Sequence, residues 1–219
     1  MIVTDQEADA IEIEWKAESE TQRILGNPAE WKERLRSLSK DANPWERPYC
    51  EAMLARSNKE YDKAWGFYNE ARLQAGQQGQ MGVYRNITLE MANQLRVEGK
   101  LLKALVMLCE VCFYDLNGPC NPGIYIDGSQ TFARIWNPET SFLAPVIVEK
   151  IREYIKTLNL GSEEFQQLIS EHLEKISTAL QPPFSPKAVL PTLFQIAFTE
   201  KDLNQIELPT KKNRYSTGG

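Results

Sequence analysis

The chain has 219 residues, of which 42% are hydrophobic and 25% charged, as in a globular protein of one large domain or two small ones. Its 25 basic and 30 acidic residues give a net charge of −5, which argues against a nucleic-acid partner. No stretch approaches the roughly 18 apolar residues that span a bilayer, and the first fifteen residues hold no basic and apolar leader. Because four cysteines are too few for a disulfide scaffold, we expect a cytoplasmic protein with reduced thiols and no membrane partner.

The N-terminal part is predicted to be helical. Residues 1–20 contain seven acidic residues and one basic residue, on a predicted helix over 5–25 that either recruits a basic partner or is simply solvated. Asn27-Pro28 is a typical helix start and predicts a helix over 28–40 with a buried stripe of Trp31, Leu35 and Leu38. Asn43-Pro44 repeats the signal, and Pro48 places the start of the next helix near Arg47 because an interior proline loses a backbone hydrogen bond.

Residues 60–114 contain a weak internal repeat. Helices are predicted at about 60–75, 81–98 and 100–114, separated by glycines. The first and third of them share a pattern with a register of 40 residues, in which Ala64, Tyr68 and Ala71 correspond to Ala104, Leu108 and Val111. The helix before each has a small residue at a matching place, Ala52 or Ala92. Small residues let two helices approach closely, so each pair is predicted to form an antiparallel hairpin.

These residues resemble the tetratricopeptide repeat family, whose unit is such a hairpin. The resemblance covers about residues 47–116. It departs from the family in its period, which is 40 instead of 34, and in lacking the closing proline. Two units are visible, and the flanking helices would supply further or capping units. The alternative interpretation is a generic α-helical bundle.

Residues 115–141 have no helical period and hold three glycines and three prolines. Such a long irregular segment is often functional. A site for a helical enzyme or a small ligand is therefore the alternative hypothesis, and its polar and aromatic groups would be Tyr125, Asp127, Arg134 and Trp136.

The C-terminal region, 142–208, is again predicted to be helical. Its first stripe is Ile147, Ile151, Tyr154, Ile155 and Leu158. The next helix starts at Ser162, and its apolar face includes the single histidine of the chain, His172, which we interpret as a hydrogen-bonded core or boundary residue. A last helical segment reaches Phe198, and residues 209–219 are predicted to be a mobile tail.

The spacing of three cysteines and the spacing of a group of glycines each resemble a functional motif, but a structural role explains both better. Cys109, Cys112 and Cys120 resemble part of a zinc site, but their neighbours are core-forming residues and a fourth ligand is missing. The glycines between 76 and 82 lack the preceding strand and the lysine of a phosphate-binding loop. We therefore expect no metal, no cofactor and no catalytic residues.

In the repeat family the first helix of each hairpin lines the concave groove. Transferred to this chain, the resemblance implies a peptide-binding face of seven residues from two helices: Tyr49, Met53, Arg56, Asn86, Leu89, Asn93 and Arg96. Asparagine can pair with a peptide backbone, and arginine with carboxylates. An ordinary exposed polar face would have the same composition.

The sequence thus predicts an all-α protein of antiparallel helix hairpins, stacked as a short tetratricopeptide-like array with additional flanking helices. It divides into a repeat region (1–114), the loop (115–141), a C-terminal helical region (142–208) and the tail (209–219). The expected function is that of a non-catalytic adaptor or scaffold that binds a protein or peptide. The alternatives are the enzyme or ligand-binding protein with a site at the loop, and a structural subunit of a larger complex.

Overall fold

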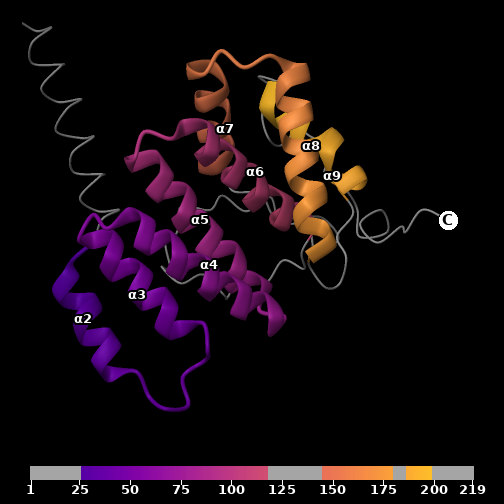
Figure 1. Ribbon diagram of the computed structural model, residues 1–219. Coiled ribbons are helices and arrows are strands. Elements are labelled where there is room, and N and C mark those ends of the chain that lie inside the picture. The colour runs from indigo at the N-terminus through magenta and orange to yellow at the C-terminus, as the bar shows by residue number, and fades with distance from the viewer. Residues whose placement is uncertain (1–25, 118–144, 180–185, 199–219) are drawn as a thin grey trace, which may run out of the picture. The chain divides into compact units, whose positions relative to one another are not determined.

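The computed structural model describes residues 26–117, 145–179 and 186–198, which form eight α-helices and no strand (Figure 1). The all-α prediction is confirmed for this part of the chain. None of the described helices is long and apolar enough to cross a membrane. The chain divides within helix α4, after Ala71, into two compact units.

The first unit contains α2 (Pro28–Ser37), α3 (Glu46–Ser57) and the beginning of α4 (Tyr61–Gln77). Asn27 caps α2 as predicted, since its side chain accepts a hydrogen bond from the Ala29 amide at 3.0 Å. The predicted stripe of α2 is only half-buried, and no residue of this helix is fully buried. Pro48 lies in the first turn of α3, where the missing N–H has no helical acceptor to lose, so the helix starts at Glu46.

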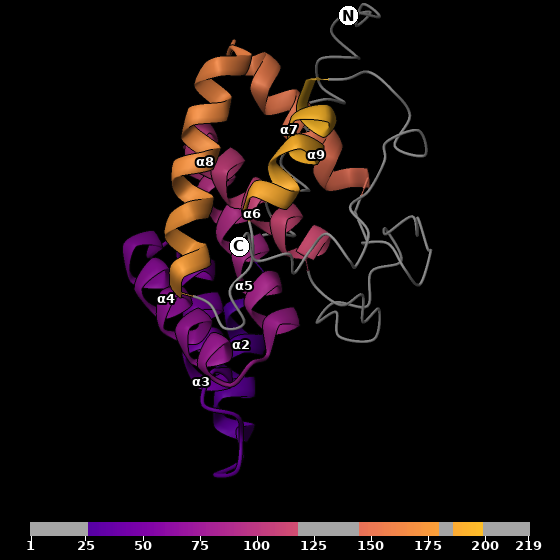
Figure 2. The same cartoon turned by 90° about the vertical axis from the view of Figure 1, so that its right-hand side faces the viewer.

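The second unit contains the end of α4 and five further helices: α5 (Met81–Val97), α6 (Leu101–Asn117), α7 (Pro145–Thr157), α8 (Ser162–Ala179) and α9 (Pro186–Phe198). Helices α5 and α6 pack along each other, and α7, α8 and α9 also contact α6. Helix α9 lies against α7 and α8 as well (Figure 2). The core of this unit is therefore arranged around α6.

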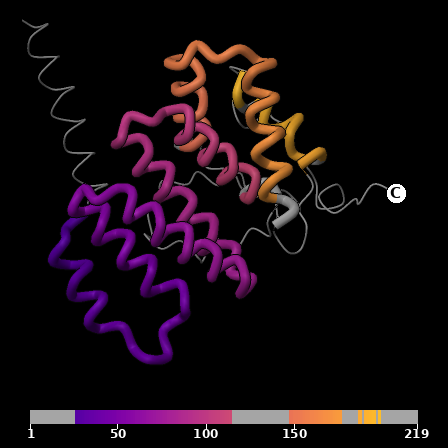
Figure 3. Tube along the Cα trace, viewed as in Figure 1, coloured from indigo at the N-terminus to yellow at the C-terminus, as the bar shows by residue number. Residues whose placement is uncertain are grey.

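The 40-residue register of the sequence is present in the helices themselves. α4 and α6 have the same length, 17 residues, and begin at positions 61 and 101. The small residues of the repeat are buried, as expected for close helix packing: Ala52, Ala64, Ala71, Ala92 and Ala104. The correspondence of these helices along the chain can be followed in the tube of Figure 3.

Four interhelical turns have the same backbone structure. Each has a residue with positive φ just after the helix: Lys59, Gly79, Gly99 and Asn159. In each, the next amide donates to the carbonyl five residues earlier, from Glu60 to Ala55, Gln80 to Ala75, Lys100 to Leu95 and Leu160 to Ile155, at 2.8–3.0 Å. This is the Schellman motif, which satisfies the last carbonyls of a helix.

The C-terminal predictions were largely correct. Ile147, Ile151, Tyr154 and Ile155 are buried, and Asn159 follows α7 in the left-handed conformation. Pro191 lies inside α9, which continues through it to Phe198. The predicted helix over 5–25 and the tail 209–219 lie outside the described residues.

Candidate functional site

The predicted peptide-binding residues of α3 lie in the core of the first unit. Tyr49, Met53 and Arg56 are at most 7% exposed. The Tyr49 ring is 6.0 Å from the ring of Trp31 in an edge-to-face arrangement, and the Met53 sulfur accepts a hydrogen bond from the Tyr68 hydroxyl at 3.1 Å. The expectation that these three side chains line an open groove is therefore corrected, since aromatic side chains pack on them.

The predicted residues of α5 have a different environment. Asn86 is buried, and its side-chain oxygen accepts from Arg85 at 3.2 Å. Leu89, Asn93 and Arg96 are partly exposed. Their spacing of four and three residues places them on one side of the helix. We call these three residues the α5 face.

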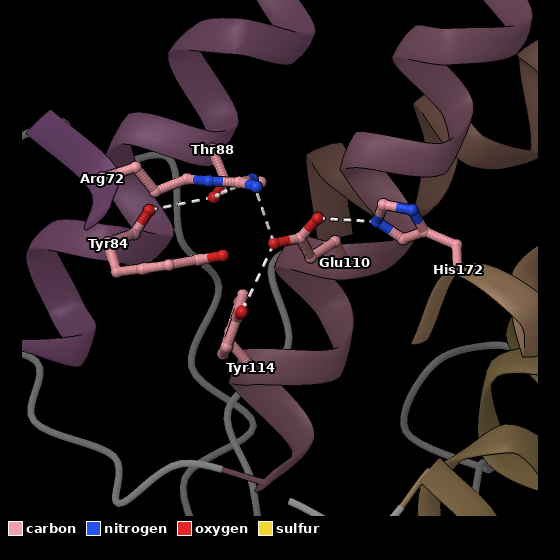
Figure 4. Close-up of polar contacts among 6 residues, drawn as sticks. All are labelled: Arg72, Tyr84, Thr88, Glu110, Tyr114 and His172. Atoms are coloured by element: carbon pink, nitrogen blue, oxygen red, sulfur yellow. Dashed lines mark hydrogen bonds and ion pairs between the residues drawn. The ribbon is translucent and has the colours of Figure 1, made fainter. Parts of the chain in front are cut away.

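A buried polar cluster in the second unit was not predicted. It consists of six residues from four helices, with Glu110 of α6 in the middle: Arg72, Tyr84, Thr88, Glu110, Tyr114 and His172 (Figure 4). We call it the Glu110 cluster. The Glu110 side chain is completely buried, whereas those of Arg72 and His172 are 16% and 22% exposed.

Three groups converge on the Glu110 carboxylate. Arg72 Nη1 lies 3.2 Å from Oε1, which also accepts from the Tyr114 hydroxyl at 3.3 Å. His172 Nε2 lies 2.7 Å from Oε2 (Figure 4). Both carboxylate oxygens are thus paired, as a buried charge requires.

The remaining residues support the arginine. The Arg72 guanidinium lies 4.8 Å from the centre of the Tyr84 ring, in a cation–π arrangement. Its Nη1 also reaches Thr88 Oγ1 at 3.5 Å, and the Thr88 hydroxyl donates to the Tyr84 carbonyl at 2.9 Å. Tyr84 and Tyr114 are in edge-to-face contact, with ring centres 5.0 Å apart. Arg72 is therefore held between a carboxylate and an aromatic ring.

The charges of the cluster stabilise one another. Burial by itself would raise the pKa of Glu110, but the hydrogen bond with His172 and the charge of Arg72 hold this pKa below its usual value. Burial raises the pKa of Tyr84 to about 12, and it also raises the pKa of Tyr114, with Glu110 adding to the effect. At neutral pH the cluster therefore contains an ionised carboxylate and two protonated tyrosines.

The interpretation of His172 as a hydrogen-bonded boundary residue is confirmed by its contact with Glu110. The sequence held one signal for the cluster, which is the charged residue within the apolar run 104–114. Lysine, glutamate, arginine and aspartate are almost never fully buried unless they are paired. The partners could not be identified because they are 38 and 62 residues away along the chain.

The cysteines have the apolar environment that the sequence indicates. Cys50, Cys109 and Cys112 are buried free thiols, and burial raises the pKa of Cys109. Within the described ranges, no three histidine, cysteine, aspartate or glutamate side chains gather as metal ligands. Cys120 lies outside these ranges.

The structure also changes the boundary of the predicted loop. Residues 115–117 belong to the end of α6. The rest of the loop, including Tyr125, Asp127, Arg134 and Trp136, lies outside the described residues. The alternative site at this loop therefore stays a hypothesis.

Comparison with known proteins gives no relative. The chain matches no protein-family model, no curated protein and no solved structure. The described residues define an all-α protein in which four pairs of consecutive helices are joined by the same type of turn, with a charged cluster in its interior.

Proposed function

We propose that this protein is a non-catalytic adaptor or scaffold that binds another protein or a peptide through the α5 face, within a tetratricopeptide-like arrangement of helices. The observation that carries the proposal is that one side of α5 is buried in the core and another side is partly exposed. Ile87, Met91 and Leu95 are at most 3% exposed in the core, whereas the α5 face remains partly exposed.

The chemistry of the α5 face suits a polypeptide partner. Leu89 offers apolar contact area. Asn93 offers both a donor and an acceptor for a peptide backbone. Arg96 carries a planar guanidinium that pairs with carboxylates; its Nε and Nη2 atoms are buried within the chain, so the side chain must turn outward to reach a partner. Arginine is also enriched among the residues that dominate binding energy at interfaces.

The environment of the Glu110 cluster supports a structural role for it. A group that acts on a substrate must be able to touch it, and Glu110 is completely buried with both oxygens engaged. The free thiols support a reducing compartment, and we propose the cytoplasm.

The proposal is tested by finding a partner and then changing the α5 face. A pull-down from the native source, followed by mass spectrometry, supplies the partner. Asn93→Ala and Arg96→Ala should each weaken its binding about tenfold, which corresponds to ~1.4 kcal/mol.

Gln166→Ala is the matched control, because Gln166 is exposed on α8, and it should bind at wild-type strength. If both α5 variants bind the partner like the wild type, the α5 face is not the site. The next region to change is then loop 115–141, the location of the alternative hypothesis.

A further inference from the structure

We propose that the contact between His172 and Glu110 selects the register in which α8 docks on α6. The two helices pack against each other. The contact joins a completely buried carboxylate to the one histidine of the chain, with 2.7 Å between Nε2 and Oε2. Its role is to decide where along its axis α8 is seated.

The apolar stripe of α8 does not fix this position by itself. Phe165, Ile169 and Leu173 are completely buried, and each lies four residues after the previous one. A helix whose apolar residues recur every turn can slide by one turn, about 5.4 Å, and still present apolar side chains to its neighbour. After a slide of one turn in one direction, Ile169 would occupy the place of Phe165, and Leu173 would occupy the place of Ile169.

The histidine removes this ambiguity. If α8 slid by four residues in either direction, the residue facing Glu110 would be Leu168 or Ile176. Neither can donate a hydrogen bond, and a buried carboxylate that loses a partner is costly. Of the four-residue shifts, only the observed register gives Oε2 of Glu110 its donor.

The other contacts of Glu110 do not depend on α8. Arg72 comes from α4, and Tyr114 from α6 itself. The carboxylate is therefore held in place by contacts that do not involve α8, and it presents one oxygen to α8. Single polar residues in an apolar helix interface define register in the same way in coiled coils.

The experiment moves the histidine by one turn. In the full chain, the double variant Leu168→His/His172→Leu keeps the composition of α8 and leaves Glu110 unchanged. Spin labels are attached through non-natural amino acids at the exposed positions Lys103 of α6 and Gln166 of α8, so that the native cysteines are kept. Their separation is measured by pulsed electron paramagnetic resonance.

We expect α8 to slide until the new histidine meets Glu110, which changes the label separation by up to about 5 Å. A separation identical to the wild type, in a folded double variant, would overturn the proposal, because apolar packing alone would then set the register.

A second variant keeps the test decisive if the first does not fold. Arg72→Leu/Glu110→Leu/His172→Leu removes the three interacting polar groups together and leaves an apolar interface. We expect a broadened or bimodal distribution of label separations, with helical content retained. A single narrow distribution at the wild-type separation would contradict the proposal.

Discussion

At the scale of single residues, Glu110 is a buried charge held from several sides. It has no exposed surface and accepts from three groups on three helices. Breaking a buried ion pair by removing one partner is far more costly than replacing the whole set by apolar residues. Changes to this carboxylate or its partners should therefore affect stability strongly.

Glu110→Gln should destabilise the fold by about 3 kcal/mol, because it leaves Arg72 and His172 without their anion in a largely buried site. The measurement is denaturant unfolding at neutral pH. Glu163→Gln is the control, since Glu163 is exposed on α8, and it should change stability by less than about 0.5 kcal/mol. Equal stability of the two variants would show that the cluster contributes little.

The same carboxylate predicts a dependence of stability on pH. The pKa of Glu110 is lower in the folded protein than its usual value, so the stability it contributes is fully present above the unfolded pKa of about 4.3. This contribution is lost as the pH falls through the folded pKa. The difference in unfolding free energy between wild type and Glu110→Gln should therefore shrink as the solution is made more acidic than about pH 5. A difference that grows on acidification would contradict this assignment.

At the scale of elements, the repeated Schellman turn fixes the helix ends. Three left-handed residues, Lys59, Gly79 and Gly99, follow one another at 20-residue intervals. Two are glycines, for which this conformation has no steric penalty. Lys59 adopts the same conformation although it carries a side chain. Glycine is therefore not required for the turn, and the packing of the two flanking helices also determines it.

Gly99→Ala should lower stability by about 1 kcal/mol, since a Cβ meets no atom within 4 Å and only the positive φ of 73° opposes it. Gly66→Ala is a control for which the change in stability should have the opposite sign. Gly66 lies inside α4, an added Cβ would meet no atom within 4 Å, and its φ is not positive. This substitution should raise stability by about 1 kcal/mol. Thermal unfolding of both variants measures the difference, and a neutral Gly99→Ala would mean that the turn rearranges.

Sequence reasoning worked where the determinants are local. The cap of α2 at Asn27, the start of α8 at Ser162 and the buried alanines of the repeat follow from residues within one or two turns. It did not reveal that Tyr49 and Met53 are buried by aromatic rings, because Trp31 and Tyr68 lie more than ten residues away. The Glu110 cluster was missed for the same reason, since pairing across 62 residues leaves no periodic signal.

At the scale of the whole molecule, the fold is expected to need no metal. The described thiols are buried among apolar residues and are free, and apolar burial is sufficient to drive folding in a chain of this length. Treatment with a chelator should leave the helical circular dichroism signal and the Tm unchanged, and elemental analysis should find no stoichiometric zinc or iron. One metal per chain, lost on Cys109→Ser, would overturn this expectation.

The buried cluster also limits how this sequence can diverge. Removing Arg72 or Glu110 alone leaves an unpaired charge, and removing His172 alone leaves one oxygen of the buried carboxylate without its donor. Replacing all three together by apolar residues avoids these penalties. Single substitutions at these three positions should therefore be rare among related sequences. In an alignment of homologues, we expect the three positions to covary, either retaining the basic, acidic and imidazole groups as a set or losing them as a set, while exposed positions such as Gln166 vary independently.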